Sequence, residues 1–83
     1  MRYTVVYDPK AQNSLARIWI GGLDRQAVTR ASNIIDRLLK YAPQFVGHAS
    51  GNQRLLIVHP LAVTYEVFPD DCKVRVLEVT RVI

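Results

Sequence analysis

The chain has 83 residues, of which 49% are apolar and 22% are charged, and its net charge is +4. This length suits one small domain, 1–83, and excludes a two-domain enzyme with a separate cofactor module. The apolar share is high for a domain whose folding buries only roughly 60–65% of the unfolded chain's surface, so we expect a partner to cover part of it. The positive charge favours an acidic protein or a nucleic acid as that partner.

Cysteine and histidine usage limits the chemistry that we expect. Cys72 is the only cysteine, so no disulfide can close within the chain, and a reducing cytoplasm is the expected compartment. We expect no metal, because His48 and His59 have no cysteine or carboxylate near them at metal-ligand spacing. No cofactor is expected, since glycine motifs for phosphates or dinucleotides are missing. No membrane segment is expected, as no apolar run approaches roughly 20 residues.

The N-terminal part of the chain predicts one strand and one helix. Residues 2–7 alternate and are rich in β-branched and aromatic side chains, which is typical of a strand. A helix is predicted to start at Asp8 and Pro9, where the Asp8 carboxylate is expected to accept hydrogen bonds from the free amides of the first turn. Gly21 and Gly22 are expected to end this helix.

A second helix is predicted to begin near Asp24 and to end at Ala42, because Pro43 disfavours helical backbone in the residue before it. It carries a wide apolar stripe along about five turns. Its opposite face, which we expect to be solvated, carries Arg30, Arg37 and Lys40. The stretch that follows, 43–52, is rich in glycine and polar residues and predicts an irregular loop.

The C-terminal part changes to a period of two and predicts three strands, at 54–59, 62–68 and 73–82. Their short connections make them antiparallel neighbours. The face of the middle strand expected under the helices carries Val63, Tyr65 and Val67, and the outward face carries Ala62, Thr64, Glu66 and Phe68. The element order predicts an α+β two-layer sandwich, β-α-α-β-β-β, with two helices packed on one face of a four-stranded, mainly antiparallel sheet. Function is expected on the open face.

Basic residues of the C-terminal strands are the candidates for a site. Arg54 begins an apolar strand and is either a phosphate contact or a strand-end arginine that donates to carbonyls of the preceding loop. His59 is either a general acid or base or a turn residue before Pro60. Three cations share one parity along the last strand and predict either a basic stripe on the open face or a solvated edge: Lys73, Arg75 and Arg81.

The combination of these positions resembles the RelE/ParE superfamily of bacterial toxins. The residues that carry the resemblance are Tyr3 and Val5, Ala11 and Leu15, Ile34 and Leu38, Pro43 and Gly47, Arg54, Tyr65 and Val67. The resemblance spans nearly the whole chain and implies the toxin of a type II toxin–antitoxin pair, which a cognate antitoxin neutralises. It implies one of two targets: RelE-like members cleave mRNA at the ribosome with the RNA's own 2′-hydroxyl as nucleophile, and ParE-like members inhibit DNA gyrase.

The resemblance also assigns roles to residues. It implies a catalytic set of Arg54 and Arg81, to which His59 is added. Contacts with a nucleic acid are expected from Arg54 and from the basic row of the last strand, Lys73, Arg75 and Arg81. The apolar last strand, with Leu77 and Val79, is expected to receive an antitoxin segment. RelE-like ribonucleases carry an arginine three residues before the tyrosine of the third strand, where this chain has Ala62. An mRNA-cleaving enzyme, a gyrase inhibitor and a degenerate homologue that binds only antitoxin therefore stay open as functions.

Overall fold

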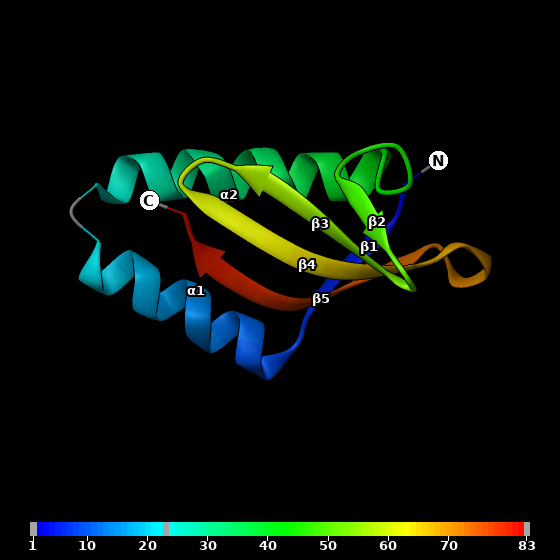
Figure 1. Cartoon of the computed structure of the whole chain (residues 1–83), viewed down its shortest axis with the longest axis horizontal. Helices are drawn as coiled ribbons and strands as arrows, with labels where there is room; N and C mark the ends of the chain where they lie inside the picture. The colour runs from blue at the N-terminus through cyan, green and yellow to red at the C-terminus, as the bar shows by residue number, and fades with distance from the viewer. Residues whose placement is uncertain (1, 23, 83) are drawn as a thin grey trace.

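The computed structural model describes residues 2–22 and 24–82. Its elements are β1 (Thr4–Tyr7), α1 (Pro9–Gly21), α2 (Arg25–Tyr41), β2 (His48–Ser50), β3 (Gln53–Val58), β4 (Leu61–Phe68), a 3-10 turn (Pro69–Asp71) and β5 (Lys73–Arg81). They form one sheet in the order β1-β5-β4-β3-β2, in which β1 and β5 run parallel and the other pairs antiparallel (Figure 1). The predicted α+β class is confirmed. Neither helix in the described residues is long and apolar enough to cross a membrane.

The sheet has five strands instead of the predicted four, because part of the expected loop forms β2. All three residues of β2 are exposed, so no apolar alternation marks this strand in the sequence. β2 pairs with β3 across a two-residue turn at Gly51 and Asn52. Gly51 has φ 61, the positive value that such tight hairpins require, and the Gly-Asn pair is the sequence signal for this turn.

Both helices have the expected ends, but only one has the expected cap. The Asp24 Oδ1 atom accepts a hydrogen bond of 3.0 Å from the Ala27 amide at the start of α2. The Ala42 amide donates to the Leu38 carbonyl oxygen at 2.8 Å and closes α2 before Pro43. Asp8 stands at the cap position of α1, yet its side chain accepts no capping hydrogen bond. The predicted Asp8 cap is therefore wrong, and its carboxylate is used elsewhere.

The core lies between the sheet and the two helices, which pack on one of its faces. The helices contribute Ala11, Val28, Ala31, Ile35 and Leu39, and the strands contribute Leu56, Leu61, Val63, Tyr65, Val74, Val76 and Val79. The predicted parity of β4 is confirmed, because Val63 and Tyr65 are buried in this core and Val67 packs against it. The opposite parity of β4 faces away from the helices, which leaves one face of the sheet open.

Candidate functional site

The open face of the sheet is apolar and balanced in charge. Its exposed apolar side chains come from β1, β3 and β4 and are Val6, Leu55, Ile57 and Phe68. On the same face, the register pairs Glu66 with Arg75, Thr64 with Glu78 and Phe68 with Lys73. Arg75 therefore stands opposite a carboxylate, whereas Lys73 stands opposite an apolar side chain. Glu78 forms an ion pair with Lys10 of α1 at 3.8 Å, so Lys73 is the one cation of these register pairs that no carboxylate of the described residues compensates. A phosphate backbone binds best to unpaired cations, so this face is poorly suited to RNA.

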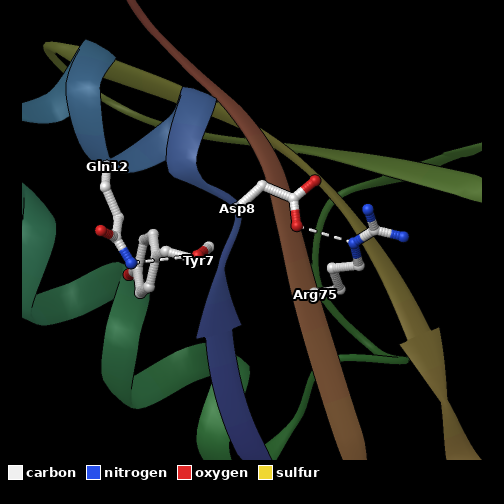
Figure 2. Close-up of polar contacts among 4 residues, drawn as sticks. All are labelled: Tyr7, Asp8, Gln12 and Arg75. Carbon is white, nitrogen blue, oxygen red and sulfur yellow. Dashed lines mark hydrogen bonds and ion pairs between the residues drawn. The ribbon is translucent and has the colours of Figure 1, made fainter.

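Arg75 is engaged by a carboxylate at the junction of β1 and α1. Its Nε atom donates to the Asp8 Oδ1 atom at 2.7 Å. The hydrogen bond and the charge of Asp8 raise the pKa of Arg75, and the charge of Glu66 adds to this effect. Figure 2 shows Asp8 and Arg75 turned toward each other, with Tyr7 and Gln12 on the other side of β1. The charge of this arginine is therefore compensated before any ligand arrives.

The backbone around Asp8 fixes this pair. The Asp8 amide donates to the Val76 carbonyl oxygen at 2.9 Å, which ties the end of β1 to β5. The Gln12 amide donates to the Asp8 carbonyl oxygen at 2.9 Å, and the Gln12 side chain donates to the Tyr7 carbonyl oxygen at 3.1 Å. Burial, and then the charge of Asp36, raise the pKa of Tyr7. The first turn of α1 thus holds Asp8 over β5.

Arg54 donates to loop carbonyls, as one of its two interpretations predicted. Its guanidinium donates to the Val46 carbonyl oxygen at 3.0 and 2.9 Å and to the Gly47 carbonyl oxygen at 3.3 Å. Arg54 pairs with Tyr65 in the register, and Tyr65 is fully buried on the helix-facing side. Arg54 therefore lies on the opposite side of the sheet from Arg75.

A bulge in β5 separates the three cations that the sequence places in one row. The register pairs Tyr65 with Val76 but Thr64 with Glu78, so Leu77 is an extra residue on β5. After Leu77, odd-numbered side chains of β5 face the helices, whereas before it the even-numbered ones do. Lys73 and Arg75 consequently face the open side, whereas Arg81 pairs with Leu61 on the helix side. The prediction of one shared row is wrong, because a period of two cannot anticipate an inserted residue.

The bulge also changes the exposure of the two residues of the last strand that were expected to contact an antitoxin. Val79 is only 2% exposed and belongs to the core. Leu77 is half-buried. The Val79 side chain therefore cannot form part of a docking surface in this conformation, contrary to the prediction.

Arg81 does meet another predicted residue. A depression of about 430 Å³ at one end of the sheet is lined by His59, Pro60, Arg81 and Val82. The Val82 amide donates to the Pro60 carbonyl oxygen at 2.7 Å and holds Val82 beside this turn. Arg54 lies at the other end of β3. The structure thus brings His59 and Arg81 together and leaves Arg54 apart from them.

A groove lies between the two helices, and the sequence did not single it out. This groove has a volume of about 650 Å³, and its lining includes Leu15, Trp19, Ile20 and Thr29. The Trp19 indole donates to the Thr29 hydroxyl at 3.1 Å, and the Arg25 guanidinium lies 4.9 Å from the Trp19 ring centroid. Helical periodicity includes Trp19 among the apolar positions of α1, but it cannot tell a core position from a groove wall.

Solved structures share this fold at low sequence identity. A chain of the RelBE2 toxin–antitoxin complex from Mycobacterium tuberculosis has a TM-score of 0.81 and 16% identity, over 98% of this chain and 99% of that chain. The isolated E. coli RelE toxin has a TM-score of 0.71 and 13% identity, over 98% of this chain and 85% of that one. The chromosomal ParDE system from P. aeruginosa has a TM-score of 0.66 and 17% identity, over 99% and 98%.

Sequence comparison alone does not reach these proteins. No protein-family model matches the sequence, and no curated protein matches it. The structural likeness covers nearly the full length of this chain in all three cases. The chain therefore has the fold of the RelE and ParE toxins, as the resemblance of its sequence implied.

Proposed function

We propose that this chain is the toxin of a type II toxin–antitoxin pair, and that it acts by binding a protein target, DNA gyrase, without cleaving RNA. The fold that it shares with RelE and ParE toxins supports the first part. The second part depends on the chemistry of the open face. Of the two targets that the resemblance implies, gyrase is the one that needs no catalytic set.

The observation that carries this proposal is the state of Arg75 on the open face. Its guanidinium is bound to Asp8 at 2.7 Å and stands opposite Glu66 of β4. Leu55 and Ile57 lie exposed on β3, the next strand beyond β4 on the same face. Charge compensation weakens attraction to phosphates. Exposed apolar side chains with few free charges are typical of the centre of a protein–protein interface. These features together favour a protein target.

Induced expression in a bacterium tests the proposal. We expect growth to stop, supercoiling by purified gyrase to be inhibited, and transcripts to remain intact in primer extension. Ile57→Glu, at a side chain that is 53% exposed, is expected to relieve the growth arrest without unfolding the chain. Ile34→Glu is the matched control, because Ile34 is 44% exposed on α2 and lies away from the open face. Harmless expression of the unchanged chain would contradict the toxin assignment and favour a degenerate homologue.

A second candidate, mRNA cleavage, is favoured by the meeting of His59 and Arg81 in one depression. In that reaction His59 would take the proton of an RNA 2′-hydroxyl, whose oxygen attacks the adjacent phosphorus. A 2′,3′-cyclic phosphate forms as the bond from phosphorus to the 5′-oxygen breaks, and the leaving oxygen takes a proton from water, while Arg81 stabilises the charge on the phosphate oxygens. New 5′ ends in primer extension that disappear with both His59→Ala and Arg81→Ala would establish this candidate in place of the gyrase proposal.

A further inference from the structure

The outward side of α2 exposes apolar side chains that neither the core nor the groove uses. Ile34 is 44% exposed and Tyr41 is 59% exposed. Arg30 comes before Ile34, and Arg37 comes between Ile34 and Tyr41. The successive spacings are four, three and four residues, which places all four side chains on one side of the helix. We name these four residues the α2 outer stripe. From Arg30 to Tyr41 it extends about 16 Å along the helix axis.

The stripe is distinct from the other two sides of α2. The core side carries Val28, Ala31, Ile35 and Leu39. The groove side carries Thr29, Ser32, Asn33 and Asp36. A solvated helix face would be polar throughout, as expected from the sequence, but the exposed Ile34 and Tyr41 break that pattern. A protein surface with apolar groups between cations is a candidate for an interface.

The two arginines of the stripe differ from the charged residues beside them. Lys40 binds Asp36 at 2.9 Å, so these two charges compensate each other. Within residues 2–22 and 24–82, no carboxylate forms an ion pair with Arg30 or Arg37. Arg2 adds a further cation, since it lines a shallow depression together with Arg37 and Tyr41. The stripe is therefore positive as well as partly apolar.

This combination determines which occupant fits. Two copies of the chain would bring Arg30 and Arg37 against each other, which is unfavourable for like charges. A membrane surface would need a wide apolar face, and the wide apolar face of α2 is already buried in the core. An amphipathic helix with apolar residues along one side and carboxylates beside them would cover the exposed Ile34 and Tyr41. Its carboxylates would form ion pairs with Arg30 and Arg37.

We propose that the α2 outer stripe docks an acidic amphipathic helix of a partner protein. The proposal deepens the proposed function and rests on it in one respect: if the chain is a type II toxin, the protein that binds the stripe is its antitoxin. It places the antitoxin contact on α2, away from the last strand and away from the open face. The face that meets the target and the face that meets the antitoxin are then separate.

A designed peptide tests the docking directly. It has about 18 residues, with leucines at heptad a and d positions and glutamates beside them, and carries a fluorescent label. Binding to the full chain is followed by fluorescence anisotropy. We expect Ile34→Glu and Arg37→Glu each to raise the dissociation constant at least about tenfold. Ile20→Glu in the groove, at a side chain 65% exposed, and Arg17→Glu on α1 are the matched controls and are expected to change it less than about twofold.

Several outcomes would overturn the proposal. A scrambled peptide of the same composition that binds equally well, or an equal loss with Arg17→Glu, would reduce the effect to net charge. Loss with Ile20→Glu and not with Ile34→Glu would move the docking site to the groove. A dimer in sedimentation that Ile34→Glu dissociates would make the occupant a second copy. Binding to phosphatidylserine vesicles that Arg37→Glu abolishes, without peptide binding, would make it a membrane.

Growth assays separate this proposal from the proposed function. With Ile34→Glu, growth arrest that persists together with lost peptide binding supports both. Peptide binding in a chain that never arrests growth contradicts the toxin assignment and leaves the docking stripe supported. Circular dichroism of each variant, compared with the unchanged chain, confirms that the substituted chain is folded, which we expect because all four substituted side chains are exposed.

Discussion

Arg54 and Tyr65 stand opposite each other on β3 and β4, and both donate hydrogen bonds to the Val46 carbonyl oxygen. The Tyr65 hydroxyl lies 3.0 Å from this oxygen and 2.8 Å from the Pro43 carbonyl oxygen. The two side chains thus fasten the loop between α2 and β2 to the sheet. This gives Arg54 a structural role that accounts for a cation at the start of an apolar strand.

Tyr65→Phe is expected to lower the free energy of unfolding by about 1–2 kcal/mol, because the hydrogen bonds of a buried hydroxyl are lost and its carbonyl partners remain. Denaturant unfolding measures the change. Tyr41→Phe provides the control, since the Tyr41 side chain is exposed, and its effect is expected to stay within about 0.5 kcal/mol. Equal effects of the two substitutions would contradict the anchoring role of Tyr65.

Arg54→Ala is expected to destabilise the chain by about 1–3 kcal/mol, because the Val46 carbonyl oxygen loses two of its donor contacts. Thermal and denaturant unfolding should both show the loss. If the unfolding free energy stays unchanged while RNA binding falls, Arg54 is a nucleic-acid contact and its structural assignment is wrong.

Asp8→Asn is expected to release Arg75 from its ion pair and so to strengthen binding of single-stranded RNA. One additional phosphate contact steepens the dependence of log K on log salt concentration by about 0.7. A salt titration with a labelled oligonucleotide checks the slope. Asp70→Asn removes the same charge from the exposed 3-10 turn and is expected to leave the slope unchanged. An identical change for both variants would attribute the effect to net charge.

Gly47→Ala is expected to cost more stability than Gly51→Ala. Both glycines have positive φ, at 73 and 61. A Cβ atom at Gly47 would lie 2.5 Å from the Leu55 carbonyl oxygen, whereas nothing lies within 4 Å at Gly51. We expect about 1 kcal/mol at Gly51 from backbone strain alone and about 2–3 kcal/mol at Gly47, where the backbone must also move. Urea unfolding of the two variants gives the comparison, and a reversed order would count against it.

Stability is expected to fall as the pH rises above about 10, the ordinary pKa of tyrosine. Burial raises the pKa of Tyr65, an effect that Arg54 partly offsets, and burial also raises the pKa of Tyr7. The unfolded chain therefore loses its tyrosine protons before the folded chain does, which favours unfolding once the pH passes the unfolded value. Unfolding curves from pH 8 to pH 11 measure this, and Tyr65→Phe should reduce the slope. A slope unaffected by that substitution would exclude Tyr65 as a contributor.

Local signals were sufficient for most of the fold. Pro9, Asp24, Pro43 and the Gly21-Gly22 pair mark helix ends through backbone preferences that act within a few residues. Alternation was enough for β1 and β4, and a short apolar run was enough for β3. β2 was missed because its residues are all exposed and its pairing depends on the neighbouring strand.

The candidate site was predicted less well, because its contacts are long-range. Asp8 satisfies every local rule for a helix cap, but Arg75, which is far away in the sequence, takes its carboxylate. Trp19 and Ile34 both fit apolar helical periodicity, although one lines a groove and the other faces solvent. Only the packing of the two helices decides between core, groove and surface at such positions.

The extra residue at Leu77 has a consequence for how sites are compared between chains of this fold. Val74 and Val76 are buried before it and Val79 after it, so the buried parity of β5 switches from even to odd numbers. A chain that lacks the bulge can be aligned with this one along β5 without a gap. Beyond Leu77, residues at the same aligned position then have their side chains on opposite faces of the sheet. The role of Arg81 therefore follows from the phase of its strand, and a role carried over by alignment column alone would be assigned to the wrong side of the sheet.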